Sequence, residues 1–184
     1  RATEHDIIIV GGGISGIALA YGLTGKKCRV AVLDGLTAAD NASFSNCGLI
    51  WCQSKFLHLP HYARWAFISA ALYPDLVREL AEVSGVAVPV SYKGGLIPVL
   101  GEEEYERRRI YIEGLREALG EYNGCMIDRA ALEKKLPKIG FGPKVVGAAW
   151  CENDGLIDPI ALVKAYRRAL PRLGVDYFGG TYVY

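Results

Sequence analysis

The chain has 184 residues, of which 51% are hydrophobic and 22% charged, and this composition excludes an intrinsically disordered polypeptide. Its formal net charge is +1, so it lacks the excess of positive charge that a nucleic-acid or anionic-membrane surface needs. The length fits one domain, or one domain and a fragment of another.

The first 34 residues predict a strand, a helix and a second strand. The run Asp6–Val10 is short and β-branched, as in a strand buried on both faces. Residues 14–25 have apolar side chains at helical spacing, and residues 28–33 predict another buried strand. Strand, helix and strand at this length form the βαβ unit of a parallel sheet. The uncharged run 7–25 contains six glycines and follows two acidic residues, so we do not interpret it as a transmembrane span.

The rest of the chain predicts alternating helices and strands. In chain order we expect a long connection over 35–53, a helix over 60–83, strands over 86–92 and 95–100, a helix over 102–119, a short helix capped by Asp128, a strand over 145–151, and a helix that Asp158 and Pro159 begin. Apolar stripes are expected at Tyr105, Ile112, Leu115 and Leu119, and at Ile160, Val163, Tyr166 and Leu170. Long connections without their own structure are usually functional.

A glycine-rich motif lies between the first strand and the first helix. Gly11, Gly13 and Gly16 have the spacing GxGxxG, and Asp34 ends the next strand. Gly11 permits a tight turn, Gly13 lets a pyrophosphate approach the backbone, and Gly16 lets helix and strand pack closely. The helix N-terminus attracts phosphates, while Asp34 can accept a hydrogen bond from a ribose 2′-OH and would repel a 2′-phosphate. The arrangement predicts dinucleotide binding and disfavours NADP, but it does not separate NAD from FAD.

Three segments carry a resemblance to a known family. They are DIIIVGGGISG at 6–16, ASFSNCGLIW at 42–51 and NDGLIDP at 153–159. The chain resembles the FAD-dependent amine oxidoreductases related to D-amino-acid oxidase, glycine oxidase and sarcosine oxidase, over residues 6–183. The middle segment, with residues 53–55 and 62–65, is most similar to the β subunits of heteromeric dehydrogenases such as opine oxidase, D-hydroxyproline dehydrogenase and hydrogen cyanide synthase.

The resemblance implies which residues contact FAD. Residues 11–16 would hold the pyrophosphate, and Asp34, where the family more often has Glu, would bind the adenosine ribose. The loop 42–49 would run past the phosphates towards the isoalloxazine ring, and the backbone near Val183 would hold the adenine. The expected cofactor-binding residues are Gly11, Gly13, Ile14, Ser15, Gly16, Asp34, Ala42, Ser43, Asn46, Gly48, Leu49 and Val183.

The resemblance also implies an α/β architecture, in which a Rossmann-like FAD-binding domain carries an inserted α+β substrate domain. Residues 1–82 and 144–184 would belong to a discontinuous FAD-binding domain, and residues 83–143 to part of the substrate domain. Family members are much longer than this chain, which is therefore expected to cover only the N-terminal half. Arg1 stands where a start methionine would be, which suggests a processed or truncated start.

Other residues have simpler explanations beside their functional ones. His58 and His61 could pair on a metal, but no carboxylate or cysteine completes a ligand set, so no metal site is expected. Cys47 and Cys52 flank the loop and are expected to be small buried thiols. The mixed charges of 102–113 are expected to form a solvated helix face. Candidates for contact with substrate are Trp51, Lys55 and Arg64.

The function implied by the resemblance is oxidation of the C–N bond of an amino acid, imino acid or opine by hydride transfer to flavin. The partners would be a small-molecule amine or amino acid and either other subunits or a missing C-terminal half. Catalytic residues stay unassigned, because the family's substrate-clamping residues lie beyond Tyr184. Two alternatives remain, a non-catalytic flavin-holding or partner-binding subunit and an NAD-dependent dehydrogenase.

The five cysteines bear on the cellular compartment. They are odd in number and include no CxxC pair, so zinc ribbons and thioredoxin-type sites find no support. Reduced thiols in the cytoplasm are the simpler interpretation, and peripheral attachment to the inner membrane is an alternative to free solution.

Overall fold

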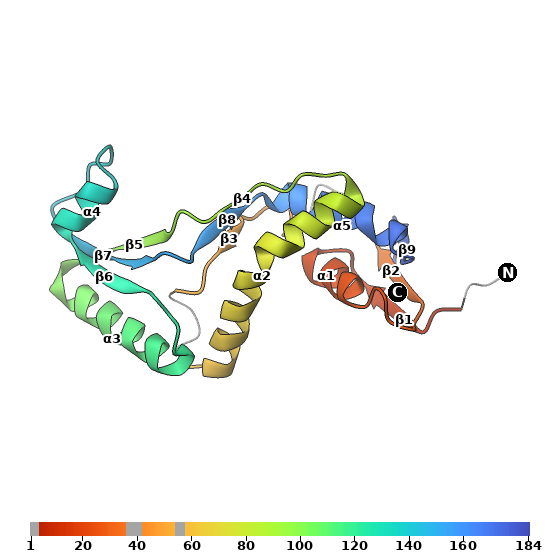
Figure 1. Ribbon diagram of the computed structural model, residues 1–184, viewed down its shortest axis with the longest axis horizontal. Helices are drawn as coiled ribbons and strands as arrows, with labels where there is room; N and C mark the ends of the chain where they lie inside the picture. Colours follow the sequence, from red (N-terminus) through yellow and green to blue (C-terminus); the bar gives the residue numbers. More distant parts are fainter. Residues whose placement is uncertain (1–3, 36–41, 54–57) are drawn as a thin grey trace. The chain divides into compact units, whose positions relative to one another are not determined.

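The computed structural model of the chain describes residues 4–35, 42–53 and 58–184. They fall into two compact units (Figure 1). The first unit is drawn from 1–48, 73–90 and 157–184, and the second from 49–72 and 91–156. These bounds differ from those of the expected domains, because 49–72 and 144–156 belong to the second unit and 83–90 to the first. The assignment of domains to cofactor and substrate remains a prediction.

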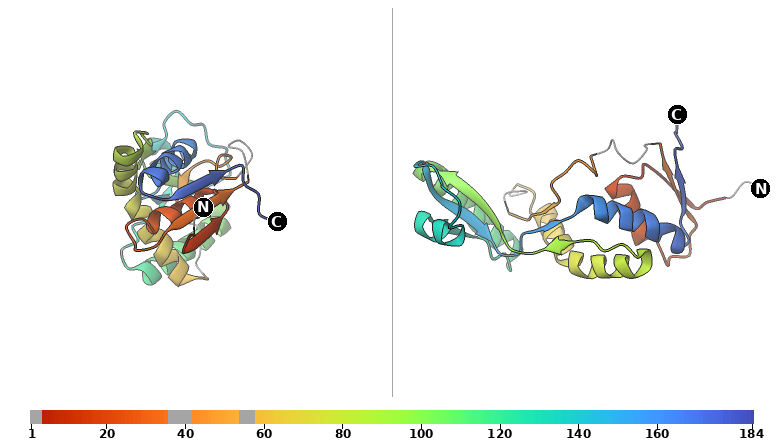
Figure 2. Two further views of the ribbon diagram at one scale, coloured as in Figure 1. Left: turned by 90° about the vertical axis from the view of Figure 1, so that its right-hand side faces the viewer. Right: turned by 90° about the horizontal axis from the view of Figure 1, so that it is seen from above.

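The first unit contains a parallel sheet in the order β1–β2–β9 (Figure 2, left). Helix α1 joins the first two strands, helix α5 leads into the third, and the helices pack on the sheet and on each other. The βαβ unit predicted from the sequence is therefore confirmed. The elements are β1 (Ile7–Val10), α1 (Ile14–Gly22), β2 (Val30–Asp34), α5 (Pro159–Arg172) and β9 (Asp176–Gly179).

Two expectations about burial in this unit are wrong. Strand β1 is not buried on both faces, since Ile8 and Val10 are 58% and 64% exposed while Ile9 is buried. Successive strand residues point to opposite faces, and Ile9 points towards α1, where its Cγ2 would lie 3.3 Å from a Cβ on Gly16. In α5, Ile160 is 54% exposed in the first turn, although the rest of the expected stripe is buried.

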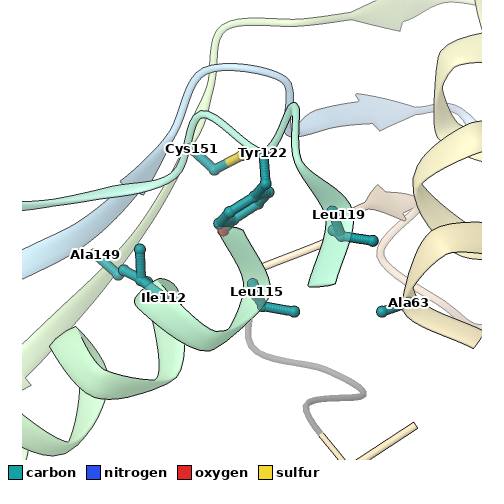
Figure 3. Packing of buried hydrophobic residues seen from close by; sticks show 7 residues of the cluster. All are labelled: Ala63, Ile112, Leu115, Leu119, Tyr122, Ala149 and Cys151. Carbon is teal, nitrogen blue, oxygen red and sulfur yellow. The ribbon is translucent and has the colours of Figure 1, made fainter. Parts of the chain in front are cut away.

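The second unit contains an antiparallel sheet in the order β5–β7–β6. Helix α3 lies along this sheet, and α4 packs against β6 and β7 (Figure 1). Three of the four residues of the expected α3 stripe are buried and pack with Tyr122, Ala149 and Cys151 (Figure 3). The elements are β5 (Gly95–Leu100), α3 (Gly101–Leu119), β6 (Cys125–Asp128), α4 (Arg129–Lys135) and β7 (Val145–Cys151).

A small sheet of short strands has the order β3–β8–β4. Its members are β3 (Leu49–Ile50), β4 (Val90–Ser91) and β8 (Gly155–Ile157). Strand β4 is much shorter than the expected strand over 86–92, and it belongs to a different sheet from β5. The sequence analysis missed β3, β6 and β8, because runs of two to four residues carry too little periodicity to be recognised.

Helix α2 (Pro60–Ser84) continues through Pro74, and this has a local explanation. Proline has no N–H, so it cannot donate to the carbonyl oxygen of Ala70 one turn earlier. The hydroxyl of Tyr92 donates to that oxygen instead, at 2.8 Å. The carbonyl that proline would have left without a donor is therefore satisfied by a side chain from another part of the chain.

Candidate cofactor-binding site

The turn between β1 and α1 has the two steric features that its glycines predict. Gly11 has a φ of 106°, a conformation that residues with a Cβ rarely adopt, and its N–H donates to the Leu33 carbonyl at 2.8 Å. A Cβ on Gly16 would lie 2.0 Å from the carbonyl oxygen of Gly11. Strand, turn and helix can therefore approach this closely only with glycine at both positions.

The N-terminus of α1 offers backbone donors. Gly13 is the N-cap and has no side chain to accept from the first turn, but Ser43 Oγ accepts from the Ile14 N–H at 2.9 Å. Within the part of the chain that the structure describes, the amides of Ser15 and Gly16 have no acceptor. Because these N–H groups lie at the positive end of the helix dipole, they fit an anionic group such as a pyrophosphate.

The loop that contributes Ser43 is held together by Asn46. The Asn46 side-chain amide donates to the carbonyls of Ala42 and Ser43 at 3.2 and 3.0 Å, and its oxygen accepts from the Gly48 N–H at 2.8 Å. A Cβ on Gly48 would lie 1.9 Å from the Ile157 carbonyl oxygen. Asn46 and Gly48 thus shape the loop itself, which brings Ser43 to the glycine turn.

Asp34 lies at the end of β2 and is almost completely buried, at 4% exposure. Its Oδ2 accepts from Arg167 Nη2 and from the Tyr177 hydroxyl, each at 2.7 Å. Burial, and then the hydrogen bond to Asp34, raise the pKa of Tyr177, which keeps this hydroxyl protonated as a donor. Asp34 Oδ2 is thus held by one cationic donor from α5 and one neutral donor from β9.

The C-terminal residues lie beside the end of β2. Thr181 donates its N–H to the Asp34 carbonyl at 3.1 Å, and a Cβ on Gly35 would lie 2.7 Å from the ring of Tyr182. Val183 follows in this segment and is 54% exposed. The structure therefore brings the segment of Val183, Asp34 and the glycine turn into one region of the first unit.

The residues that were considered for metal binding or substrate contact do not form a common site within the described residues. His58 and His61 are exposed, and no group of three metal-binding side chains occurs among residues 4–35, 42–53 and 58–184. Arg64 is exposed and makes a long hydrogen bond of 3.5 Å to the Ala118 carbonyl. Trp51 is half-buried, and Lys55 lies outside the described residues.

The sequence analysis expected Cys47 and Cys52 to be buried thiols. Cys52 is buried, but Cys47 is exposed.

A second buried aspartate, in the second unit, was not expected from the sequence. Asp154 is fully buried; its Oδ1 accepts from the Cys52 N–H at 3.1 Å and its Oδ2 from Gln53 Nε2 at 2.5 Å. Burial raises the pKa of Asp154, and it also raises the pKa of the Cys52 thiol to about 12 and that of the Cys151 thiol to about 11. These thiols are protonated at neutral pH and unsuited to nucleophilic chemistry.

The sequence analysis gave no role to Arg167 and Tyr177, which both donate to Asp34 Oδ2. A Cβ on Gly12 would lie 2.3 Å from the Tyr177 hydroxyl, and the Phe44 ring centroid lies 5.4 Å from the Arg167 guanidinium. No sequence signal marked Arg167, which is one basic residue on an amphipathic helix among 21 Lys and Arg residues in the chain.

A glycine turn between a parallel strand and a helix, with an acid at the end of the next strand, defines a dinucleotide-binding domain of the Rossmann type. The family model described as "FAD dependent oxidoreductase" (DAO) matches residues 6–183. The chain belongs to this family, and its cofactor is FAD. The expected α/β fold and cofactor are thereby confirmed, and the alternative of an NAD-dependent dehydrogenase is wrong.

Individual relatives agree with the family. An opine oxidase subunit of Rhizobium meliloti is 36% identical over 95% of this chain and 47% of that protein. Glycine oxidase of Geobacillus kaustophilus is 28% identical over 98% of this chain and 47% of its own length. The crystal structure of glycine oxidase from Geobacillus kaustophilus matches 97% of this chain and 47% of its own, with a TM-score of 0.81 at 25% identity. The chain therefore spans about half the length of the curated relatives it matches.

The lengths and hydropathies of the helices bear on insertion into a lipid bilayer. Among the helices that the structure describes, none has both the length and the apolar character required to cross a membrane. The long apolar run near the N-terminus is divided between β1, the glycine turn and α1, as the sequence predicts.

Proposed function

We propose that the protein to which this chain belongs oxidises the C–N bond of an amino acid, imino acid or opine with FAD. The single observation that carries the proposal is the glycine turn and the available first-turn amides of α1, in a chain of the FAD dependent oxidoreductase family. The names of similar proteins, an opine oxidase and a glycine oxidase, support an amine substrate. Bound FAD supplies the hydride acceptor for this reaction.

Within this proposal the residues of the chain bind and orient the cofactor. The segment 11–16 would donate backbone N–H groups to the pyrophosphate, and Asp34 would accept from the adenosine ribose. The loop 42–49 would hold the part of FAD between the phosphates and the flavin, and the backbone at Val183 would hold the adenine. Residues 1–82 and 144–184 would serve this binding, and residues 83–143 would contribute to the substrate domain. Trp51, Lys55 and Arg64, which lie in the first of these ranges, remain candidates for contact with substrate.

The proposal is tested by the visible absorption spectrum of the purified protein, recorded without oxygen before and after addition of sarcosine, proline, D-hydroxyproline or an opine. We expect an oxidised-flavin spectrum that bleaches with one of these amines. A flavin spectrum that none of a broad amine panel bleaches would contradict amine oxidation. Full flavin loading without turnover, with turnover restored by a second subunit, would favour the alternative of a flavin-holding subunit.

We further propose that this protein is one subunit of a heteromeric enzyme. One side of α2 carries four exposed apolar side chains, and they support the presence of a polypeptide that covers them. They are Tyr62, Trp65, Ile68 and Leu72, which are 44%, 65%, 53% and 58% exposed.

The subunit proposal is tested by the size and composition of the complex purified from the producing cells. We expect Trp65→Lys to release the partner polypeptide. A matched control is Ile160→Lys, which changes an apolar residue of similar exposure outside this stripe and should leave the complex intact. Retention of the partner by both variants would contradict the proposal.

We also propose a cytoplasmic location. All five cysteines are free thiols in the structure, which agrees with a reducing compartment. Fractionation of the producing cells tests this, and recovery of the protein with the membranes in low salt would favour peripheral attachment instead.

A further inference from the structure

We propose that Arg167 is a positioning residue of the FAD site and that it acts on the cofactor through Asp34. This inference rests on the proposed function, since it assigns a further residue to the same site. Arg167 lies on α5 and does not itself contact the cofactor in this proposal. It fixes the carboxylate that accepts from the adenosine ribose.

The contacts of Arg167 join three segments that are far apart in the sequence. Its Nη2 donates to Asp34 Oδ2 at 2.7 Å and lies 3.3 Å from the Gly12 carbonyl oxygen. The guanidinium also lies over the ring of Phe44, 5.4 Å from its centroid. The glycine turn, the acid at the end of β2 and the loop that follows it are the three segments to which the sequence assigns most of the FAD contacts.

Burial explains why Asp34 needs this partner. The Asp34 side chain is 5% exposed and that of Arg167 is 19% exposed, so both charges are largely removed from water. A buried carboxylate is stable in its charged form only with a nearby cation or several hydrogen bonds. Arg167 supplies the cation, and Tyr177 adds a second hydrogen bond to the same oxygen.

The two N–H groups on one nitrogen matter as well as the charge. Nη2 of Arg167 donates to the Asp34 carboxylate and to the Gly12 carbonyl, so a single atom joins the two segments. Arg167 thereby fixes the distance between Asp34, the proposed ribose acceptor, and the glycine turn proposed to bind the pyrophosphate.

The proposal is tested with dissociation constants for FAD, measured by fluorescence on the apoprotein. We expect Arg167→Gln to weaken FAD binding about 10-fold, because a hydrogen bond with a charged group contributes at least this much. Arg168→Gln is the matched control, since Arg168 is the exposed neighbour on the same helix and should change affinity less than about 2-fold.

The decisive comparison is a double-mutant cycle with Asp34→Asn. If Arg167 acts through Asp34, Arg167→Gln should not weaken FAD binding further once Asp34→Asn is present. A purely structural role would instead lower affinity by the same factor in both backgrounds, and such additivity would overturn the proposal. Wild-type affinity in Arg167→Gln would overturn it as well.

Two further outcomes are distinguishable. If Arg167→Gln fails to fold, the double variant, which has no uncompensated buried carboxylate, is compared with Asp34→Asn alone; equal affinities support the proposal and a further loss overturns it. If the wild-type protein does not bind FAD, the proposed function and this inference both fail. If the wild-type protein binds FAD and Arg167→Gln binds it equally well, the inference about Arg167 fails and the proposed function stands.

Discussion

The chain buries two aspartates, and their surroundings differ in kind. Asp34, in the first unit, shares its Oδ2 between the guanidinium of Arg167 and the hydroxyl of Tyr177. Asp154, in the second unit, accepts from a backbone N–H and from the side-chain amide of Gln53. A carboxylate that faces a cation suits a ligand site, whereas one that accepts only from neutral donors suits an anchor of the backbone.

Each aspartate also has a glycine packed against it. A Cβ on Gly12 would lie 2.5 Å from Asp34 Oδ2, and a Cβ on Gly95 would lie 2.5 Å from Asp154 Oδ2. Both glycines therefore lie against their carboxylates, and the two regions differ in the charge of the donors and in their expected role towards FAD. This contrast can be tested by substitution.

The largest effect is expected for Gly16→Ala, in the glycine turn of the first unit. The new Cβ would overlap the Gly11 carbonyl, so the variant should lose about 3 kcal/mol of stability or more, together with FAD binding. Gly22→Ala, at the other end of α1, meets no atom within 4 Å and should be neutral or slightly stabilising. Urea unfolding of the two variants measures the difference, and equal midpoints would contradict the close packing at Gly16.

The second largest loss of stability is expected on removal of the Asp154 carboxylate. Asp154→Ala leaves two buried donors without an acceptor, those of Cys52 and Gln53, and should cost about 2–3 kcal/mol. Chemical denaturation measures this cost. Asp128→Ala, which removes an exposed helix cap on α4, is the comparison and should cost about 1 kcal/mol. A smaller loss for Asp154→Ala than for Asp128→Ala would show that Asp154 is not an anchor.

The pH dependence of stability should also identify Asp154. Burial raises its pKa above the ordinary value of 3.8, so the folded state holds the proton more tightly than the unfolded chain. Its stabilising contribution is complete below pH 3.8 and is lost as the pH rises through the folded pKa. The stability of the wild-type protein relative to Asp154→Asn should therefore decrease as the pH rises from 3.8. A difference that is constant with pH would contradict the shift.

The glycine pair compares the two regions most directly. Gly12→Ala and Gly95→Ala should each cost about 2 kcal/mol, because each new methyl group overlaps neighbouring side-chain atoms. Only Gly12→Ala should weaken FAD binding, since it displaces Asp34 and Tyr177. Fluorescence titration of the folded variants with FAD decides this, and equal loss of affinity in both would remove the functional distinction between the two aspartates.

The smallest effect is expected at the loop. Ser43→Ala removes the acceptor of the Ile14 N–H at the start of α1 and should cost about 1 kcal/mol, as the loss of an N-cap does. Ser45→Ala, at an exposed position of the same loop, is the control and should change stability by less than about 0.5 kcal/mol. Thermal unfolding distinguishes them, and identical curves would mean that Ser43 does not cap the helix.

Signals that lie within a few residues of one another were read correctly from the sequence. The glycine spacing predicted the turn before α1, and Asp128 and Asp158 cap their helices as expected. The apolar stripe of α3 predicted its buried face. These features depend on local backbone geometry and on helical periodicity, which are properties of short stretches of sequence.

The sequence by itself therefore determined the βαβ unit, the helix caps and the position of the glycine turn. Only the tertiary structure decided the partners of the two aspartates, since Asp34 and Arg167 are 133 positions apart and Gln53 and Asp154 are 101 apart. It also decided that Ile8 and Val10 are exposed, which their apolar character did not predict. The physical reason is that burial and pairing depend on which faces of distant elements meet, and no local pattern records this.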